Sequence, residues 1–231
     1  MFDNRKIIDL TQPLSPKIPT WDGTQGFELN TVLDYEQCNS PVKFRVQKIN
    51  CKAGAGTHMD APSHCAPGAP NIGDIPVNKF IMPGVVINVS KKADADYQIS
   101  PQDILEFELI HGKIAKGTLV IGYTGWEKYW HDPIHYRNAD ASGEMHFPTF
   151  AHATVKMLLE REIAGIAIDT LSPETATTGF PIHHDLLAAQ KIIIENIANV
   201  SCLPTTGFYV VALPLKMSGA TESPVRVIAV I

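Results

Sequence analysis

The stretch GAGTHMDAPSHC, Gly54 to Cys65, gathers two histidines, an aspartate and a proline into a short segment. If its THMD portion is an extended strand, successive side chains alternate between two faces. His58 and Asp60 then project from one face, and Met59 projects from the other as a core residue would. The following proline ends such a strand. His64 therefore lies in the turn beyond, free to swing back over the face of His58 and Asp60.

This arrangement suits metal chemistry, although the spacing alone does not require it. An imidazole and a carboxylate on one face are a ligand pair for zinc or manganese. The second histidine of the stretch, His64, could act as a general acid or base at neutral pH. The alternative is a surface strand on which His58 and Asp60 only hydrogen-bond to each other.

A second group of candidate ligands lies in PIHHDLLAAQKIIIENI, Pro181 to Ile197. Glu195 follows three consecutive isoleucines, and a carboxylate in so apolar a run is at least partly buried and needs a partner or a metal. The side chains of His183 and His184 diverge because the two residues are adjacent, so one of them faces a given site. The alternative is a helix whose Glu195 points to solvent.

Composition and charge narrow the class of protein. The chain has 231 residues, of which 45% are hydrophobic and 19% charged, as expected for one globular domain. The net charge of −5 and the absence of a Lys/Arg cluster argue against a nucleic-acid partner. The cysteines lack CxxC spacing and the N-terminus lacks the apolar region of a signal peptide. We therefore expect a reduced, soluble, cytoplasmic protein with no membrane partner.

Hydrophobic patterning predicts a mixture of strands and helices without strict alternation, which favours an α/β or α+β domain with a mixed sheet. Ser100 is a typical N-cap, with Pro101 at the first helical position and Asp103 in the first turn. The expected helices cover 100–110, 150–163 and 183–190. The expected strands cover 44–49, 82–90, 117–125, 164–172, 207–215 and 223–231.

These motifs together resemble one family. GTHMDAPSH resembles the G-T-H-x-D-x-P-x-H signature of the cyclase-like metal-dependent hydrolases, which include bacterial kynurenine formamidase and isatin hydrolase. The HH-x-x-L and I-x-x-E-N segments, the tail LPLKMSGATESPVRVI and the early loop IPTWDG also match. The resemblance spans nearly the whole chain in family order. It implies a single domain over 1–231 with the family's swivelling β/β/α-type fold.

The resemblance also implies an activity: hydrolysis of an amide-type bond (formamide, lactam or related cyclic amide) in a small substrate, with one divalent metal, zinc or manganese. By position, His64 is the implied proton-transferring residue. Trp21 and Phe27 could form an apolar wall against an aromatic or cyclic substrate, although packing or an oligomer contact would equally explain Trp21. The implied metal ligands are His58, Asp60, His183 and Glu195.

The chain departs from the family pattern at one position. Many members place a further histidine two positions before the glycine of G-T-H, where it helps to hold a second metal. Gly54 stands there in this chain, so we expect one metal, and the nearby Cys51 is out of register to replace the histidine. Glu222 in GATESP is a smaller departure from the usual acidic-glycine form.

Two other functions stay open from the sequence. One is a metal-dependent cyclase or dehydratase, and the other is a catalytically inactive protein that binds a small molecule on the same fold. The family habit of assembly leads us to expect a homodimer or homotetramer.

Overall fold

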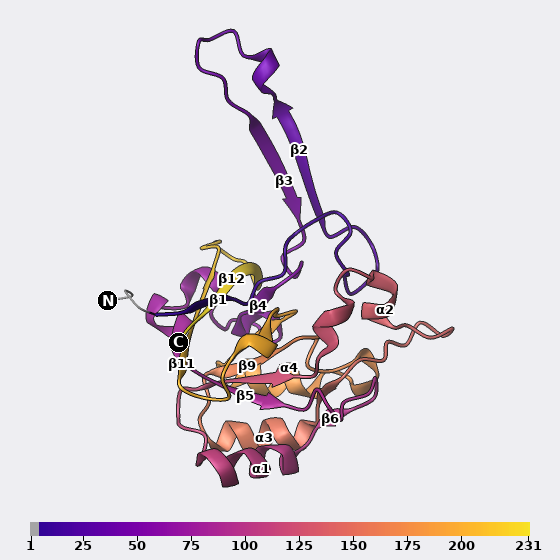
Figure 1. Cartoon of the computed structure of the whole chain (residues 1–231), viewed down its shortest axis with the longest axis vertical. Coiled ribbons are helices and arrows are strands. Elements are labelled where there is room, and N and C mark those ends of the chain that lie inside the picture. Colours follow the sequence, from indigo (N-terminus) through magenta and orange to yellow (C-terminus); the bar gives the residue numbers. More distant parts are fainter. Residues whose placement is uncertain (1–4) are drawn as a thin grey trace.

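The computed structural model describes residues 5–231, whose main element is an eight-stranded mixed sheet (Figure 1). In spatial order its strands are β1 (Ile7–Asp9), β12 (Glu222–Val230), β11 (Phe208–Pro214), β5 (Ile81–Asn88), β7 (Leu119–Tyr123), β9 (Gly165–Ile168), β10 (Ile192–Glu195) and β4 (His58–Asp60). β5, β7, β9 and β10 run parallel, and the other pairings are antiparallel. β4 also pairs with β12, which closes the sheet into a barrel-like ring. The expected α/β fold with a mixed sheet is confirmed.

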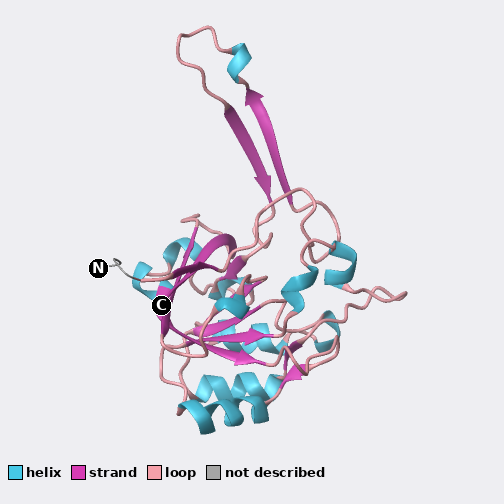
Figure 2. Ribbon diagram, viewed as in Figure 1, coloured by secondary structure: helices cyan, strands magenta, loops and turns pink. Residues whose placement is uncertain are grey.

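Helices cover the outer face of the parallel strands (Figure 2). They are α1 (Pro101–His111), α3 (His152–Glu160) and α4 (Pro181–Ala188), with the shorter α2 (Pro133–Arg137) near the loops. α1 begins as predicted, because the Ser100 side chain accepts a hydrogen bond from the backbone N–H of Asp103 and Pro101 occupies the first turn. Ile104, Val155 and Leu186 from the three long helices meet in one apolar cluster on this face. None of the helices in the described part of the chain combines the length and hydropathy of a membrane-spanning segment.

The inside of the closed sheet is apolar, and strand alternation fixes what faces outward. Met59 of β4, Ile194 of β10 and Val225 of β12 belong to the interior cluster. Side chains an odd number of residues away along the same strand point to the opposite face. His58 and Asp60 therefore face outward, together with Glu195 and Glu222.

A two-stranded arm projects from this body, formed by β2 (Phe27–Leu33) and β3 (Val46–Cys51) (Figure 1). Leu29 and Ile49 are cross-strand partners on one face of the arm, and both are exposed. The strand expected at 44–49 thus forms at 46–51, but it belongs to the arm and does not enter the central sheet. A further short pair joins β6 (Gln98–Ile99) to β8 (Thr149–Phe150).

Candidate metal centre and active site

Strand register places three acidic side chains around one histidine. Glu195 of β10 is the cross-strand partner of His58, and Glu222 of β12 is the partner of Asp60. Directly opposed residues of antiparallel strands project from the same face. Because β4 lies between β10 and β12, all of these side chains gather at one level of the outer face.

His183 reaches the same place from α4, which packs over that face. Phe180 precedes the helix in a left-handed conformation, with φ of 61°, and Pro181 begins it. His183 is buried, whereas the side chain of His184 is 73% exposed. Of the adjacent pair, the structure directs His183 inward and His184 to solvent.

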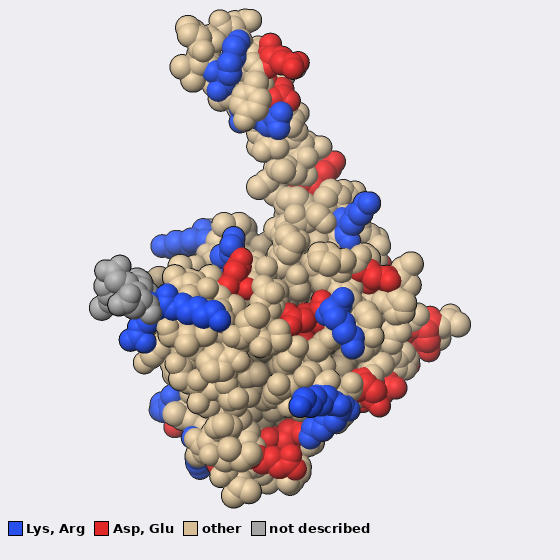
Figure 3. Space-filling model, viewed as in Figure 1, with Lys and Arg blue, Asp and Glu red and all other residues tan. Residues whose placement is uncertain are grey.

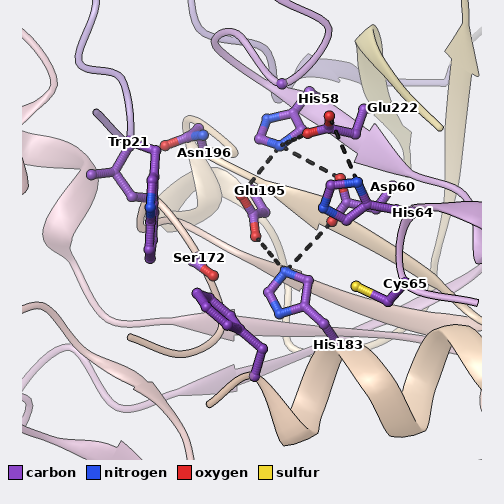
Figure 4. Close-up of a pocket in the computed structure, with 13 residues that line it drawn as sticks. Trp21, His58, Asp60, His64, Cys65, Ser172, His183, Glu195, Asn196 and Glu222 are labelled. Atoms are coloured by element: carbon purple, nitrogen blue, oxygen red, sulfur yellow. Dashed lines mark ion pairs between the residues drawn. The ribbon is translucent and has the colours of Figure 1, made fainter. Parts of the chain in front are cut away.

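The four expected ligands converge (Figure 4). His58 Nε2 lies 3.2 Å from Glu195 Oε2 and 3.6 Å from Asp60 Oδ1. His183 Nε2 lies 3.4 Å from Glu195 Oε1 and 3.8 Å from Asp60 Oδ2. Each carboxylate thus directs one oxygen towards each imidazole, which is the arrangement expected of ligands around a cation.

Both imidazoles are fixed in the tautomer that a metal needs. The Nδ1–H of His58 donates to the carbonyl oxygen of Gly56 at 2.9 Å, and that of His183 donates to Glu174 Oε1 at 2.8 Å. The Nε2 lone pairs therefore point into the cavity when the rings are neutral. Glu174 also accepts the backbone N–H of His183 and the hydroxyl of Thr178, so its carboxylate is itself held in place.

The charge balance of this cluster favours a cation. Asp60 Oδ1 is buried and has no hydrogen-bond partner among residues 5–231, and such a group is costly unless another group satisfies it. Burial lowers the pKa of His58, but the hydrogen bond and charge of Glu195 and the charge of Asp60 raise it to about 10. Burial also lowers the pKa of His183, and hydrogen bonds to Glu174 and Glu195 raise it to about 11. The donor set of imidazole nitrogens and carboxylate oxygens fits zinc or manganese.

His64 lies at the edge of the cluster, in the short 3-10 turn Pro62–His64 that follows β4. Its Nδ1 is 3.7 Å from Glu222 Oε2, and its ring centroid is 6.2 Å from that of His183. The side chain is about one third exposed. His64 is therefore beside the cluster and open to the cavity.

The cluster forms one side of a cavity of about 380 Å³, within the size range of small-molecule sites. An aromatic pair lines another side, with the rings of Trp21 and Phe180 5.9 Å apart. Phe27 does not line this cavity: it is buried in a separate core cluster with Ile18 and Trp126. The placement therefore does not support Phe27 as part of the wall. Phe180, which follows a glycine just before the helix, lines the cavity beside Trp21 instead.

Comparisons with known proteins agree with this geometry. The family model described as "Putative cyclase" matches residues 8–175. The chain belongs to the cyclase family. Isatin hydrolase of Roseibium aggregatum is 28% identical, over 98% of this chain and 92% of its own, and kynurenine formamidase of Salinibacter ruber is 24% identical, over 96% of each. The structure of isatin hydrolase A from Labrenzia aggregata, bound to benzyl benzoate, has a TM-score of 0.89 and 30% identity, over 98% of this chain and 94% of its own.

Within this cyclase-family site, sequence reasoning missed the residues that support the ligands. Asn196 has a positive φ and donates from Nδ2 to the same Gly56 carbonyl that orients His58. Glu174 fixes His183, although it is nine residues away in sequence. An asparagine or glutamate beside a conspicuous ligand motif is a signal for such support, but only the fold shows which atom it holds.

Proposed function

We propose that this protein is a metal-dependent hydrolase that cleaves an amide-type bond in a small cyclic or aromatic substrate. One observation carries the proposal: buried imidazoles from a strand and a helix direct their Nε2 atoms at the same two buried carboxylates. The similarity to isatin hydrolase and kynurenine formamidase supports the same class of reaction. The residues that would hold the cation are His58, Asp60, His183 and Glu195.

A divalent zinc or manganese ion bound there supplies Lewis acidity, which polarises a scissile carbonyl and lowers the pKa of water. The protein's own contribution is the preorganised frame around it. Gly56 and Glu174 fix the two imidazoles, so little reorganisation is required when a ligand arrives. Burial of Asp60 and Glu195 excludes bulk water and strengthens electrostatic interactions at the reacting bond.

His64 is the residue placed to move a proton. In hydrolysis, the water oxygen bonds to the carbonyl carbon, the C–N bond breaks, and a proton must reach the leaving nitrogen. His64 faces the cavity beside the cluster and would take that proton from water and deliver it to the nitrogen. Glu222, 3.7 Å from His64 Nδ1, stabilises the imidazolium that forms between the two transfers.

The aromatic side of the cavity indicates the shape of the substrate. Trp21 and Phe180, together with Leu171, offer apolar contact opposite the polar cluster. A planar ring that carries an amide would stack on the aromatic pair and present its carbonyl to the charged side. Isatin, a cyclic amide, and the N-formyl amide of kynurenine are the first compounds to assay.

The test is hydrolysis of these amides by the metal-loaded wild type and by His64→Asn. We expect turnover by the wild type and a loss of about 10²–10⁴-fold in kcat for the variant, with its metal content unchanged. An unchanged kcat in His64→Asn would remove His64 from the mechanism. Bound but unconverted amides would instead favour a small-molecule-binding protein.

We also propose that the chain forms a homodimer or homotetramer. The apolar face of the arm, with Leu29 and Ile49, has no cover within the described chain, and an isolated two-stranded ribbon is only marginally stable. Light scattering on Leu29→Ser/Ile49→Ser and on the wild type tests this: dissociation of the variant is expected, and a monomeric wild type would contradict it.

On the face that Figure 3 shows, basic and acidic residues are interspersed, which suits a small-molecule enzyme better than a nucleic-acid binder. A cytoplasmic location remains our prediction from the sequence.

A further inference from the structure

In the proposed function, the Glu222 carboxylate only stabilises the imidazolium of His64. It begins β12 opposite Asp60, and its side chain is about one quarter exposed. Its Oε1 lies 4.0 Å from His58 Nε2, and its Oε2 faces His64. Figure 4 shows Glu222 and Glu195 on different sides of His58 and Asp60. The side away from Glu195 thus has its own carboxylate.

The lack of a side chain at Gly54 leaves room for this carboxylate. A Cβ at position 54 would overlap Glu222 Oε1 and would lie 3.4 Å from His58 Nε2. Glu222 therefore occupies the volume beside His58 that a side chain at 54 would otherwise take. Cys51, the other nearby donor in sequence, does not line the cavity and bonds to the carbonyl of Lys52.

Asp60 connects the two sides. Its Oδ2 faces His183 and its Oδ1 faces His58. The Oδ1 atom is buried, and no group in the described part of the chain hydrogen-bonds to it. Asp60, His183 and Glu195 can each place one ligand atom within 4.8 Å of the others. His58, Asp60 and Glu222 can do the same on the opposite side. A carboxylate shared between two such groups is the usual bridge of a two-metal site.

We infer that Glu222 completes a second divalent-cation position with His58 and Asp60, so that the chain binds two ions where its sequence favoured one. His58 has only its Nε2 free, so with both ions bound it serves the second ion, and Asp60, His183 and Glu195 hold the first. This inference rests on the proposed function, because it extends the same metal centre. Glu222 replaces the side chain that Gly54 lacks and reaches the position from a different strand. The proximity of Glu222 to His64 places the proposed proton carrier beside this second ion.

The experiment titrates the chelator-stripped full chain with Mn²⁺, counts bound manganese by elemental analysis after dialysis, and records electron paramagnetic resonance spectra. Ions that share a carboxylate lie about 3.5–4 Å apart, so their spins couple and the six-line pattern of isolated Mn²⁺ is lost. We expect about two ions per wild-type chain with a coupled spectrum. Glu222→Gln should bind about one ion with a six-line spectrum, while Glu162→Gln, on the surface, should match the wild type.

Gly54→Ala provides a second variant, which keeps the identity of every ligand residue. Its added Cβ displaces Glu222 Oε1, so it should weaken the second ion and retain the first. A wild type that binds one ion, lost in Glu195→Gln but kept in Glu222→Gln, would overturn this inference and leave the proposed function standing. A wild type that binds no manganese or zinc would overturn both.

Discussion

Glu174→Gln tests whether the residue behind His183 tunes the metal centre. Glu174 is 1% exposed and accepts from the His183 backbone N–H at 2.7 Å, from its Nδ1–H at 2.8 Å and from the Thr178 hydroxyl at 2.9 Å. Glutamine keeps an oxygen for the two His183 donors, and its amide can donate to the Thr178 hydroxyl. The substitution therefore removes the negative charge and preserves the shape.

The lost charge makes His183 a weaker ligand, because a carboxylate partner raises the basicity of the imidazole. Changes to such partners lower metal affinity by about 10- to 100-fold, which corresponds to about 1.4–2.8 kcal/mol. Complete burial of Glu174 favours the upper end of this range. The assay is competition between the stripped protein and a chelator of known affinity for Mn²⁺.

The matched control is Glu108→Gln, which removes a carboxylate paired with Arg161 on the helical side of the molecule. Its manganese affinity should equal that of the wild type. A Glu174→Gln protein that keeps its circular dichroism spectrum and binds manganese within twofold of wild type would refute the reasoning, because His183 would then not depend on Glu174.

Other predictions concern stability and the substrate wall. Met59→Ala, which empties a fully buried site inside the closed sheet, should lower the free energy of unfolding by about 2–5 kcal/mol in urea titrations; a loss under 1 kcal/mol would contradict the packing described. Burial raises the pKa of Asp103, but hydrogen bonds from Lys92 and Ser100 lower it below its ordinary value. Asp103 therefore stabilises the fold above about pH 4, and this contribution is lost as pH falls through its lowered pKa. Asp103→Asn should reduce the Tm at pH 7, and the difference from wild type should shrink towards pH 3. Phe180→Ala should raise KM for an aromatic amide about tenfold or more with a smaller change in kcat, and an unchanged KM would exclude Phe180 from the wall.

Local patterning was sufficient to predict one strand of the site. Alternation placed His58 and Asp60 on one face and Met59 in the core, and each lies there. The run before Glu195 was ambiguous, because consecutive isoleucines suit a buried strand or a helix equally. It forms β10, and the pairing of β10 with β4 is a long-range contact that no local pattern specifies.

Long-range pairing also explains why the sequence does not predict the site positions of Glu222 and Glu174. Glu222 reaches the site only because β12 pairs with β4 and closes the sheet, and Glu174 only because α4 returns over it. The sequence predicts Phe27 beside Trp21, but the structure buries Phe27 at the base of the arm. The arm itself was missed, since its apolar residues are exposed and resemble an ordinary strand in sequence.

The most direct test of the account is amide hydrolysis measured as a function of metal occupancy. Chelator-stripped wild type should hydrolyse the amide at least about a hundredfold more slowly than the metal-loaded protein, because Lewis-acid stabilisation contributes several kcal/mol. Added manganese or zinc should restore the rate in proportion to bound metal. Glu195→Gln should recover neither the activity nor the ion that Asp60, His183 and Glu195 hold. Hydrolysis at an undiminished rate by protein shown to hold no metal would contradict the account.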